Sequence, residues 1–140
     1  MLTRDMHARL DIIANALVDV KKAQEGLPTR ALDKLKERIQ RLVPSDSYDS
    51  NRLEMELALI ADRLDITEEC VRLDGHIGAF RKTLNKPDGP VGKKLGFLLQ
   101  EMNREANTIA SKSVDIEVTR QAVEAKCIIE KLREQVQNVE

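Results

Sequence analysis

The chain has 140 residues, which is enough for one domain and short for two. Charged residues make up 34% of it and aromatic residues 2%, with no tryptophan, which excludes a large aromatic core and favours long helices or coiled coils. The formal net charge of -1 excludes an overall basic field, so the total charge does not indicate nucleic-acid binding.

Charges interrupt the N-terminal segment, which has neither a long apolar stretch nor a small-residue cleavage site. We therefore expect no signal peptide and no membrane span, and a cytoplasmic location follows as the default. The two cysteines, Cys70 and Cys127, lie far apart on apolar spacings without a C-x-x-C motif. This pattern is typical of reduced core cysteines.

Residues 1–43 are predicted to form two helices, because their apolar residues recur every three or four positions. The apolar residues of the first helix are Leu10, Ile13, Leu17 and Val20. Those of the second helix are Leu32, Leu35, Ile39 and Leu42. Gly26 should end the first helix, Pro28 suits the first turn of the second, and Pro44 should stop it before a loop over residues 44–50.

Residues 51–84 are predicted to form a single helix with two apolar stripes that shift around it. The first stripe is Leu53, Leu57, Ile60 and Leu64, and the second is Ile66, Cys70, Leu73, Ile77, Phe80 and Leu84. Gly75 and Gly78 each lower helix propensity by about 1 kcal/mol relative to alanine, which favours a bend or a close approach there. The sequence NKPDGP at residues 85–90 cannot continue a helix.

Residues 91–140 carry two more apolar stripes that do not join in one phase, so we expect a break near residues 111–115. The last stripe, Val118, Ala122, Ala125, Ile129, Leu132, Val136 and Val139, alternates strictly by four and three, as in coiled coils. The predicted fold is all-α: antiparallel long helices with coiled-coil-like packing in an oligomeric helical bundle. Other copies of the chain or a missing domain are expected to cover its apolar seams.

Basic residues gather in the middle of the chain, where residues 81–112 contain seven Lys and Arg against three Asp and Glu. The seven are Arg81, Lys82, Lys86, Lys93, Lys94, Arg104 and Lys112. This segment is either a local basic patch that binds an anion or an ordinary solvated helix face.

Asp65, Glu69, Arg72 and His76 follow a 4-3-4 spacing, which places them along one polar stripe of a helix. Two carboxylates and an imidazole can share one Mn²⁺ or Mg²⁺, and a metal bound to phosphate can activate water for phosphodiester cleavage. The alternative is a row of solvated ion pairs, each worth only a few tenths of a kcal/mol.

Residues 100–112 place amides, hydroxyls, carboxylates and cations on two neighbouring stripes. One stripe is Gln100, Arg104, Asn107 and Ser111, and the next is Glu101, Glu105, Thr108 and Lys112. Such side chains can hold phosphates, ribose and a metal together. The alternative is a buried polar network that fixes the register of the helices.

Two segments, PVGKKLGFLLQEMNREANTIASK at residues 90–112 and EKLREQVQNVE at residues 130–140, resemble the C-terminal domain of the bacterial YicC/YloC family. The similarity extends upstream through NRLEMELALIADRLDITEECVRLDGHI and covers essentially the whole chain. The resemblance implies a C-terminal helical domain over residues 1–140: first helices in 1–43, an acidic and histidine-bearing helix in 51–84, and signature and heptad helices in 91–140. It also implies that an N-terminal domain is absent from this chain.

The resemblance further implies a metal-dependent endoribonuclease that assembles as a ring-like hexamer and closes on RNA. By position, Glu56, Asp65, Glu69, Arg72 and His76 match the family's acidic helix, and Gln100, Glu101, Asn103, Arg104, Glu105, Asn107 and Lys112 match its second signature. From their chemistry we predict Mn²⁺ or Mg²⁺ ligands at Asp65, Glu69, His76, Glu101 and Glu105. Catalytic roles are predicted for His76, Glu101 and Glu105. The predicted RNA contacts are Arg72, Lys93, Lys94, Gln100, Asn103, Arg104, Asn107 and Lys112.

This chain departs from the family pattern at Gly96, where members commonly carry Asp, and at Gly78. Two other functions stay open. One is a non-catalytic RNA-binding or adaptor module that uses the same polar stripes. The other is a structural role in which residues 118–139 are the oligomerisation element.

Overall fold

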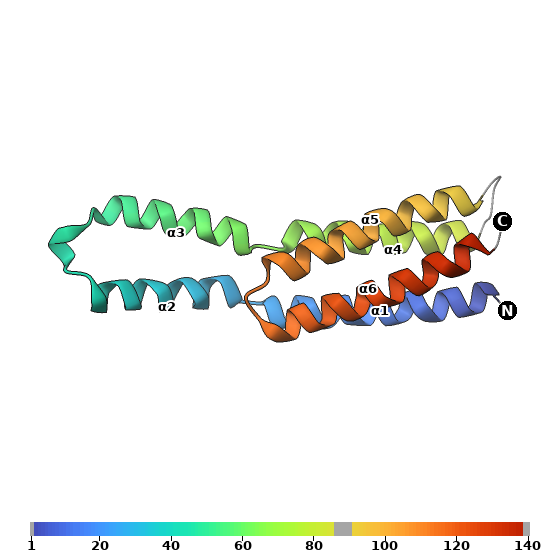
Figure 1. Ribbon diagram of the computed structural model, residues 1–140, viewed down its shortest axis with the longest axis horizontal. Helices are drawn as coiled ribbons and strands as arrows, with labels where there is room; N and C mark the ends of the chain where they lie inside the picture. The colour runs from blue at the N-terminus through green and yellow to red at the C-terminus, as the bar shows by residue number, and fades with distance from the viewer. Residues whose placement is uncertain (1, 86–90, 139–140) are drawn as a thin grey trace.

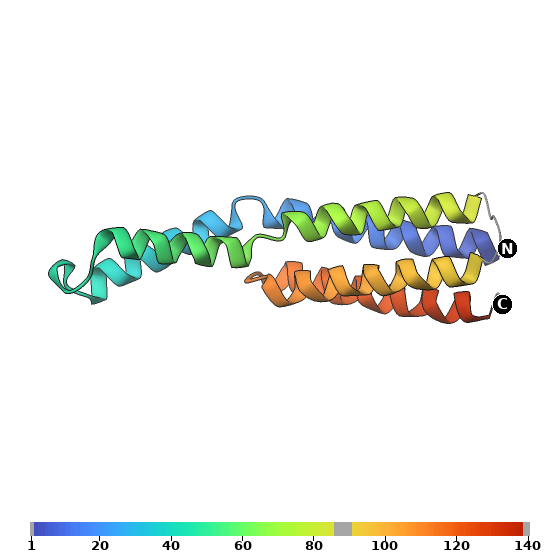
Figure 2. The same cartoon turned by 90° about the horizontal axis from the view of Figure 1, so that it is seen from above.

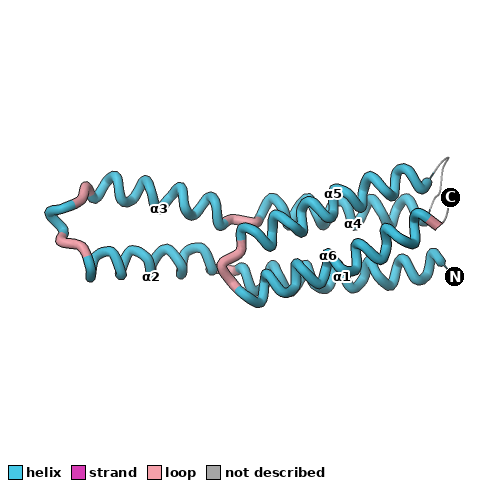
Figure 3. Tube along the Cα trace, in the orientation of Figure 1, coloured by secondary structure: helices cyan, strands magenta, loops and turns pink. Residues whose placement is uncertain are grey.

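The computed structural model describes residues 2–85 and 91–138, and helices occupy almost all of this part of the chain. The α-helices are α1 Leu2–Gln24, α2 Leu27–Leu42, α3 Ser50–Leu64, α4 Thr67–Asn85, α5 Val91–Lys112 and α6 Ile116–Gln137, with a short 3-10 helix, η1, at Ser45–Ser47. Figure 3 shows helices and loops only over these residues. The all-α prediction is confirmed. The predicted break at residues 86–90 lies outside the described residues.

Four long helices pack side by side into a bundle with an antiparallel arrangement of chain neighbours (Figure 1). Viewed from above, α1 and α4 form one layer and α5 and α6 the other, with α6 against α1 and α5 against α4 (Figure 2). The start of α1 and the end of α6 lie at the same end of the bundle. Each helix therefore buries one apolar stripe against two neighbours, as in other four-helix bundles.

The heptad stripe of α6 lies inside this bundle. Ile129 is 2% exposed and Leu132 is fully buried, and α6 packs against α1 and α5 of the same chain. The expectation that other copies or a missing domain cover this stripe is therefore wrong for residues 118–136, because α1 and α5 already cover it. Val139 lies outside the described residues. The number of copies in an assembly stays a prediction.

Helices α2 and α3 form an antiparallel arm that projects beyond one end of the bundle (Figure 1). The arm begins at Gly26, whose φ of 73° is left-handed, and a Cβ there would lie 2.8 Å from Nη1 of Arg30. Glycine is favoured in that conformation because it has no Cβ. The described residues of α2 include no buried side chain, and those of α3 include only Leu57. The arm thus has a thin apolar seam and no core of its own.

The predicted single helix over residues 51–84 is wrong, because the chain breaks between Leu64 and Thr67. Asp65 adopts an extended backbone, with φ −76° and ψ 121°, and its carboxylate accepts a hydrogen bond of 2.9 Å from the backbone N–H of Thr67. The Thr67 hydroxyl donates to the same oxygen. An Asp that satisfies free N–H groups starts a helix. The shift of the apolar stripe in the sequence therefore marks two helices, one in the arm and one in the bundle.

The two cysteines differ in their surroundings. Cys70 is buried, and burial raises the pKa of its thiol to about 11, so it stays protonated at neutral pH. Cys127 is exposed, which corrects the prediction that both cysteines are core residues. The predicted close approach at Gly75 and Gly78 is wrong as well, since a Cβ at either position would meet no atom within 4 Å. Among the described helices, none is long and apolar enough to cross a membrane.

The Asp65 cap gives a pH-dependent prediction. The hydrogen bonds from Thr67 lower the pKa of Asp65 below its ordinary value of 3.8, so the cap stabilises the fold above that pH and loses its effect as the pH falls through the lowered pKa. We expect Asp65→Ala to reduce the free energy of unfolding by about 0.5–1 kcal/mol at pH 7, because the carboxylate is exposed, and by much less near pH 2. Urea unfolding at both pH values measures this.

Asp62→Ala is the matched control, because Asp62 is an exposed carboxylate of α3 just before the break. A loss for Asp65→Ala that equals the control at pH 7, or that is the same at both pH values, would contradict the capping role.

Candidate functional site

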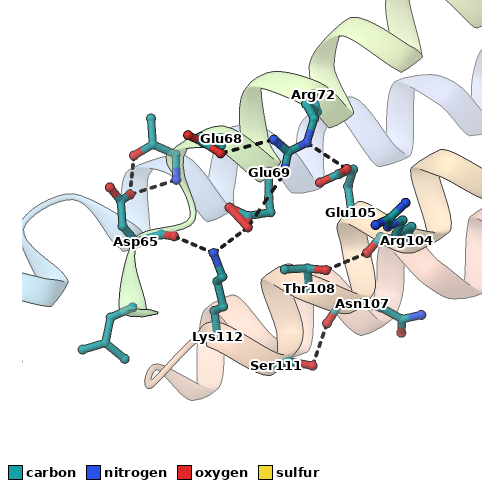
Figure 4. Close-up of polar contacts among 12 residues, drawn as sticks. Asp65, Glu68, Glu69, Arg72, Arg104, Glu105, Asn107, Thr108, Ser111 and Lys112 are labelled. Carbon is teal, nitrogen blue, oxygen red and sulfur yellow. Dashed lines mark hydrogen bonds and ion pairs between the residues drawn. The ribbon is translucent and has the colours of Figure 1, made fainter. Parts of the chain in front are cut away.

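The charged side chains of α4 and α5 meet where these helices face each other, near the junction with the arm. We call Glu68, Glu69, Arg72, Glu105 and Lys112 the charged cluster, which Figure 4 shows with its polar contacts. The first three come from α4 and the last two from α5. The cluster brings together two of the predicted metal ligands and two of the predicted RNA contacts.

Arg72 joins the two helices through Glu105. Its Nε lies 2.9 Å from Oε1 of Glu105, and Glu105 is only 5% exposed. The same guanidinium reaches Glu68 at 3.3 Å and Glu69 at 4.0 Å. The hydrogen bond with Glu105 is the largest of the effects that raise the pKa of Arg72. The guanidinium is therefore held as a permanent cation beside a buried carboxylate.

Lys112 holds the second buried carboxylate. Its Nζ lies 2.8 Å from Oε2 of Glu69, which is 3% exposed, and it also donates to the backbone carbonyl of Asp65 at 3.3 Å. The last residue of α5 is thus tied to the first turn of α4 and to the loop before it. A carboxylate taken out of water needs such a partner, because an unpaired buried charge is very costly.

The predicted RNA contacts Arg72 and Lys112 are engaged with buried carboxylates in this structure. The charged cluster has three carboxylates against two cations, so it has no excess positive charge. For these residues the arrangement matches the alternative read from the sequence, a buried polar network that fixes helix register.

His76 and Glu101 lie one helical turn further along the same pair of helices, away from the arm. Helices α4 and α5 are antiparallel neighbours, and Arg72 faces Glu105. Four residues forward on α4 leads to His76, and four residues back on α5 leads to Glu101. Because four residues are about one helical turn, the register places this histidine opposite this glutamate. Both side chains are half-buried. The three predicted catalytic residues thus lie along one seam between α4 and α5.

The predicted metal ligands do not come together as one set in this chain. Asp65 caps α4, Glu69 and Glu105 each face a cation, and the described residues contain no group of three or more His, Cys, Asp or Glu side chains placed to hold a metal ion. In this arrangement Asp65, Glu69 and Glu105 are each engaged by hydrogen bonds or ion pairs within the chain.

The remaining predicted RNA contacts lie on the outer surface of α5. Lys93, Lys94, Gln100, Arg104 and Asn107 are exposed, and Asn103 is half-buried. The hydroxyls of the two polar stripes are turned back on their own helix: Thr108 donates to the carbonyl of Arg104 at 3.1 Å, and Ser111 to that of Asn107 at 3.0 Å. Cations and amides, rather than hydroxyls, are therefore the groups that this face offers to a ligand.

A pocket of about 530 Å³ lies between α5 and α6. Its lining includes the predicted residues Lys93, Gln100 and Asn103, and it adds Glu130, Arg133 and Gln137 from α6. Sequence reasoning did not select these α6 residues. The sequence shows that these residues lie beside the apolar heptad stripe, which assigns them to one face of their helix. It does not show which other helix packs next to that face.

Comparisons with known proteins give one consistent result. A family model described as "Endoribonuclease YicC-like, C-terminal" matches residues 20–140. The chain is 44% identical to "Probable endoribonuclease YicC" of Clostridioides difficile (strain 630), a match that covers 99% of this chain and 47% of that protein. It is 41% identical to the protein of the same name from Haemophilus influenzae, over 94% of this chain and 45% of that protein. The chain spans about half the length of the curated relatives it matches.

The buried pair of Glu69 and Lys112 gives a stability prediction. Lys112→Met keeps the aliphatic part of the side chain and removes the charge, which leaves Glu69 buried with only Arg72 at 4.0 Å. We expect the free energy of unfolding to fall by about 1–3 kcal/mol, and the added substitution Glu69→Leu to recover part of the loss. Urea unfolding at pH 7 measures both.

Lys131→Met is the control, because Lys131 is exposed on α6, and it should change stability by less than about 0.5 kcal/mol. If Lys112→Met cost no more than this control, the pair would have no structural role.

Proposed function

The chain belongs to the family of YicC-like endoribonucleases, whose C-terminal part it matches, and from this premise we propose that it forms the helical part of an enzyme that hydrolyses internal phosphodiester bonds of RNA. The observation that carries the proposal is its identity of 41–44% to two probable endoribonucleases over nearly its whole length. Because the chain covers about half of those relatives, the activity is proposed for a protein that contains it.

The outer face of α5 is the proposed RNA-binding surface. Lys94 and Arg104 are exposed there, and Gln100 and Asn107 add amide donors and acceptors. Cations supply most of the affinity for a phosphate backbone, and amides can bond bases and ribose. Arg72 and Lys112 contribute differently in this proposal, because they hold Glu105 and Glu69 and so position the seam between α4 and α5.

The proposed catalytic groups are His76 and Glu101, with Glu105 one turn away. An imidazole and a carboxylate that face each other can transfer protons at neutral pH. In the proposed reaction a water attacks the phosphorus, one group takes the proton of that water, and a proton is delivered to the sugar oxygen as its bond to phosphorus breaks. Glu105, held by Arg72, is proposed to fix the helix turn that presents this pair.

Dependence on Mn²⁺ or Mg²⁺ is the second part of the proposal. It rests on donor chemistry alone, since carboxylate oxygens suit these hard cations and a metal would supply Lewis acidity at the phosphate. Because Glu69 and Glu105 face cations in this arrangement, we assign no ligand geometry to a metal.

The proposed partners are RNA, the remaining part of the longer protein, and further copies of the chain, six in the assembly that the resemblance implies. The arm supports an assembly, because Met55 and Leu59 on α3 are 69% and 50% exposed, while the α6 stripe is already covered within the chain. The cytoplasm remains the expected location.

The cleavage prediction compares His76→Ala and Glu101→Ala with the parent, using a labelled structured RNA in EDTA, Mg²⁺ and Mn²⁺. We expect each substitution to lower the cleavage rate by about 10²-fold or more at unchanged helical content, because proton transfer contributes about that much. The assay is run on this chain and on the full-length protein.

His7→Ala is the control, because His7 is the chain's other histidine. Its side chain forms a hydrogen bond with Asn85, the last residue of α4, nine residues after His76. Cleavage at the parental rate by both variants would overturn the catalytic assignment. Intact RNA with a correctly folded full-length protein under every condition would leave a non-catalytic RNA-binding or adaptor role.

The RNA-binding face gives a separate prediction. Lys94→Gln and Arg104→Gln should each weaken RNA binding, and each should reduce the slope of log K against log salt concentration by about 0.7 if it removes one phosphate contact on a single strand. Fluorescence anisotropy across a salt series measures both quantities. Lys131→Gln on α6 is the control. An unchanged slope in both variants would place the RNA elsewhere.

A further inference from the structure

The pocket between α5 and α6 is lined by residues mainly from the first half of α5 and from the second half of α6. Figures 1 and 2 show that α5 begins and α6 ends at the end of the bundle away from the arm. The pocket volume of about 530 Å³ falls within the range of about 300–1,000 Å³ that is usual for small-molecule sites. It is separate from the charged cluster, with which it shares no lining residue.

The lining combines the three kinds of group that a nucleotide requires. The floor is apolar, formed by Leu99, Ile129 and Val136, which are all at most 5% exposed. The cations are Lys93 from α5 and Arg133 from α6. The amides are Gln100, Asn103 and Gln137, each of which can both donate and accept hydrogen bonds. A base can lie on the apolar floor, with its edge toward the amides and its phosphate toward the cations.

Gly96 keeps the pocket open on the α5 side. A Cβ at this position would meet no atom within 4 Å, so the space beside the helix is unfilled. A larger side chain there would extend into the space that a ligand would use. Substitution of this one residue therefore blocks the pocket without a clash in the core.

The charges of the pocket favour an anionic ligand. Glu130 also lines it, and its Oε2 lies 3.6 Å from Nη1 of Arg133, with both side chains about 60% exposed. Ion pairs at such exposed positions are weak, about 0–1 kcal/mol, so Arg133 can turn to a phosphate at little cost. An Arg–phosphate contact is the stronger interaction, because two N–H groups can bond two oxygens.

The position of the pocket relates it to the proposed catalytic seam. Gln100 lines the pocket, and the next residue of α5 is Glu101, which the register places opposite His76. A ligand in the pocket would lie beside the same turn of α5. Because successive residues lie about 100° apart around a helix, the pocket and the seam are on different sides of α5, and an RNA strand that contacts both would cross the exposed surface of this helix.

We infer that this pocket is a subsite for one nucleotide of single-stranded RNA, with the phosphate on Lys93 and Arg133 and the base edge on the amides of Gln100, Asn103 and Gln137. The inference rests on the proposed function for its ligand class. It adds a second place of contact, formed by α5 and α6, that would hold the strand next to the bond to be cleaved.

The test measures binding of a fluorescein-labelled single-stranded pentanucleotide RNA to the 140-residue chain by anisotropy. We expect Gly96→Leu and Arg133→Gln each to raise the Kd by about tenfold, through loss of space and loss of a phosphate contact. The matched controls are Gly78→Leu and Arg120→Gln: Gly78 is another helical glycine with no atom near its Cβ position, and Arg120 is an exposed arginine of α6 paired with Glu117. They should change the Kd by less than about twofold.

If Gly96→Leu and Arg133→Gln both bind the RNA with unchanged affinity and keep the helical content of the parent, the inference is overturned. A pocket that binds a protein instead of RNA would give this result. If Gly96→Leu fails to fold, Arg133→Gln decides alone. The cleavage assay distinguishes failure of the subsite inference from failure of the proposed nuclease function. If the parent and the pocket variants cleave RNA at the same rate and bind it with the same affinity, only the subsite is refuted. Pocket-dependent binding by a full-length protein that leaves RNA intact would support the subsite and refute the nuclease.

Discussion

Two carboxylates buried between α4 and α5 constrain the rest of the molecule. Glu69 and Glu105 are almost fully removed from water, and a carboxylate buried in this way needs a partner of opposite charge. Lys112 and Arg72 supply those cations across the helix pair, at 2.8 and 2.9 Å. A shift of either helix by one turn would separate Lys112 from Glu69 and Arg72 from Glu105. The apolar core stabilises a bundle of these helices, and the ion pairs select one register.

The same register organises the candidate chemistry. Because Arg72 faces Glu105, the antiparallel register of α4 and α5 predicts that His76 and Glu101 lie near each other one turn further along the seam. The ion pairs also limit what their own members can do, since a buried carboxylate that is paired with a cation is less free to hold a metal, and a paired cation contributes less to binding a phosphate. Along this seam the ion pairs nearest the arm hold α4 and α5 together, and the two residues of the catalytic proposal, His76 and Glu101, lie one helical turn further on.

The bundle and the arm are built on different principles. In the bundle every stripe meets two neighbours, and residues such as Leu10, Phe80 and Leu132 are fully buried. In the arm α2 and α3 pack mainly against each other, and a two-helix contact cannot enclose a core. The break at Asp65 separates these regions, and Lys112 bonds its backbone carbonyl, so the base of the arm is tied to the charged cluster.

Periodicity within the sequence was sufficient to predict the all-α class, the helix α2 and the buried stripes of α1, α5 and α6, because a helix with an apolar residue every three or four positions buries that face away from water. The segment QEMNREAN at residues 100–107 was sufficient to identify the resemblance to the family. The end of α3 at Leu64 was missed, because its signal is a single Asp two residues before Thr67, in a region where the apolar stripe shifts without stopping. Tertiary structure alone decided that the heptad stripe of α6 faces its own chain, that Arg72 and Lys112 hold buried carboxylates, and that Arg133 shares a pocket with Lys93. The physical reason is that periodicity determines which face of a helix is buried, whereas the neighbour on that face depends on how all the helices pack together.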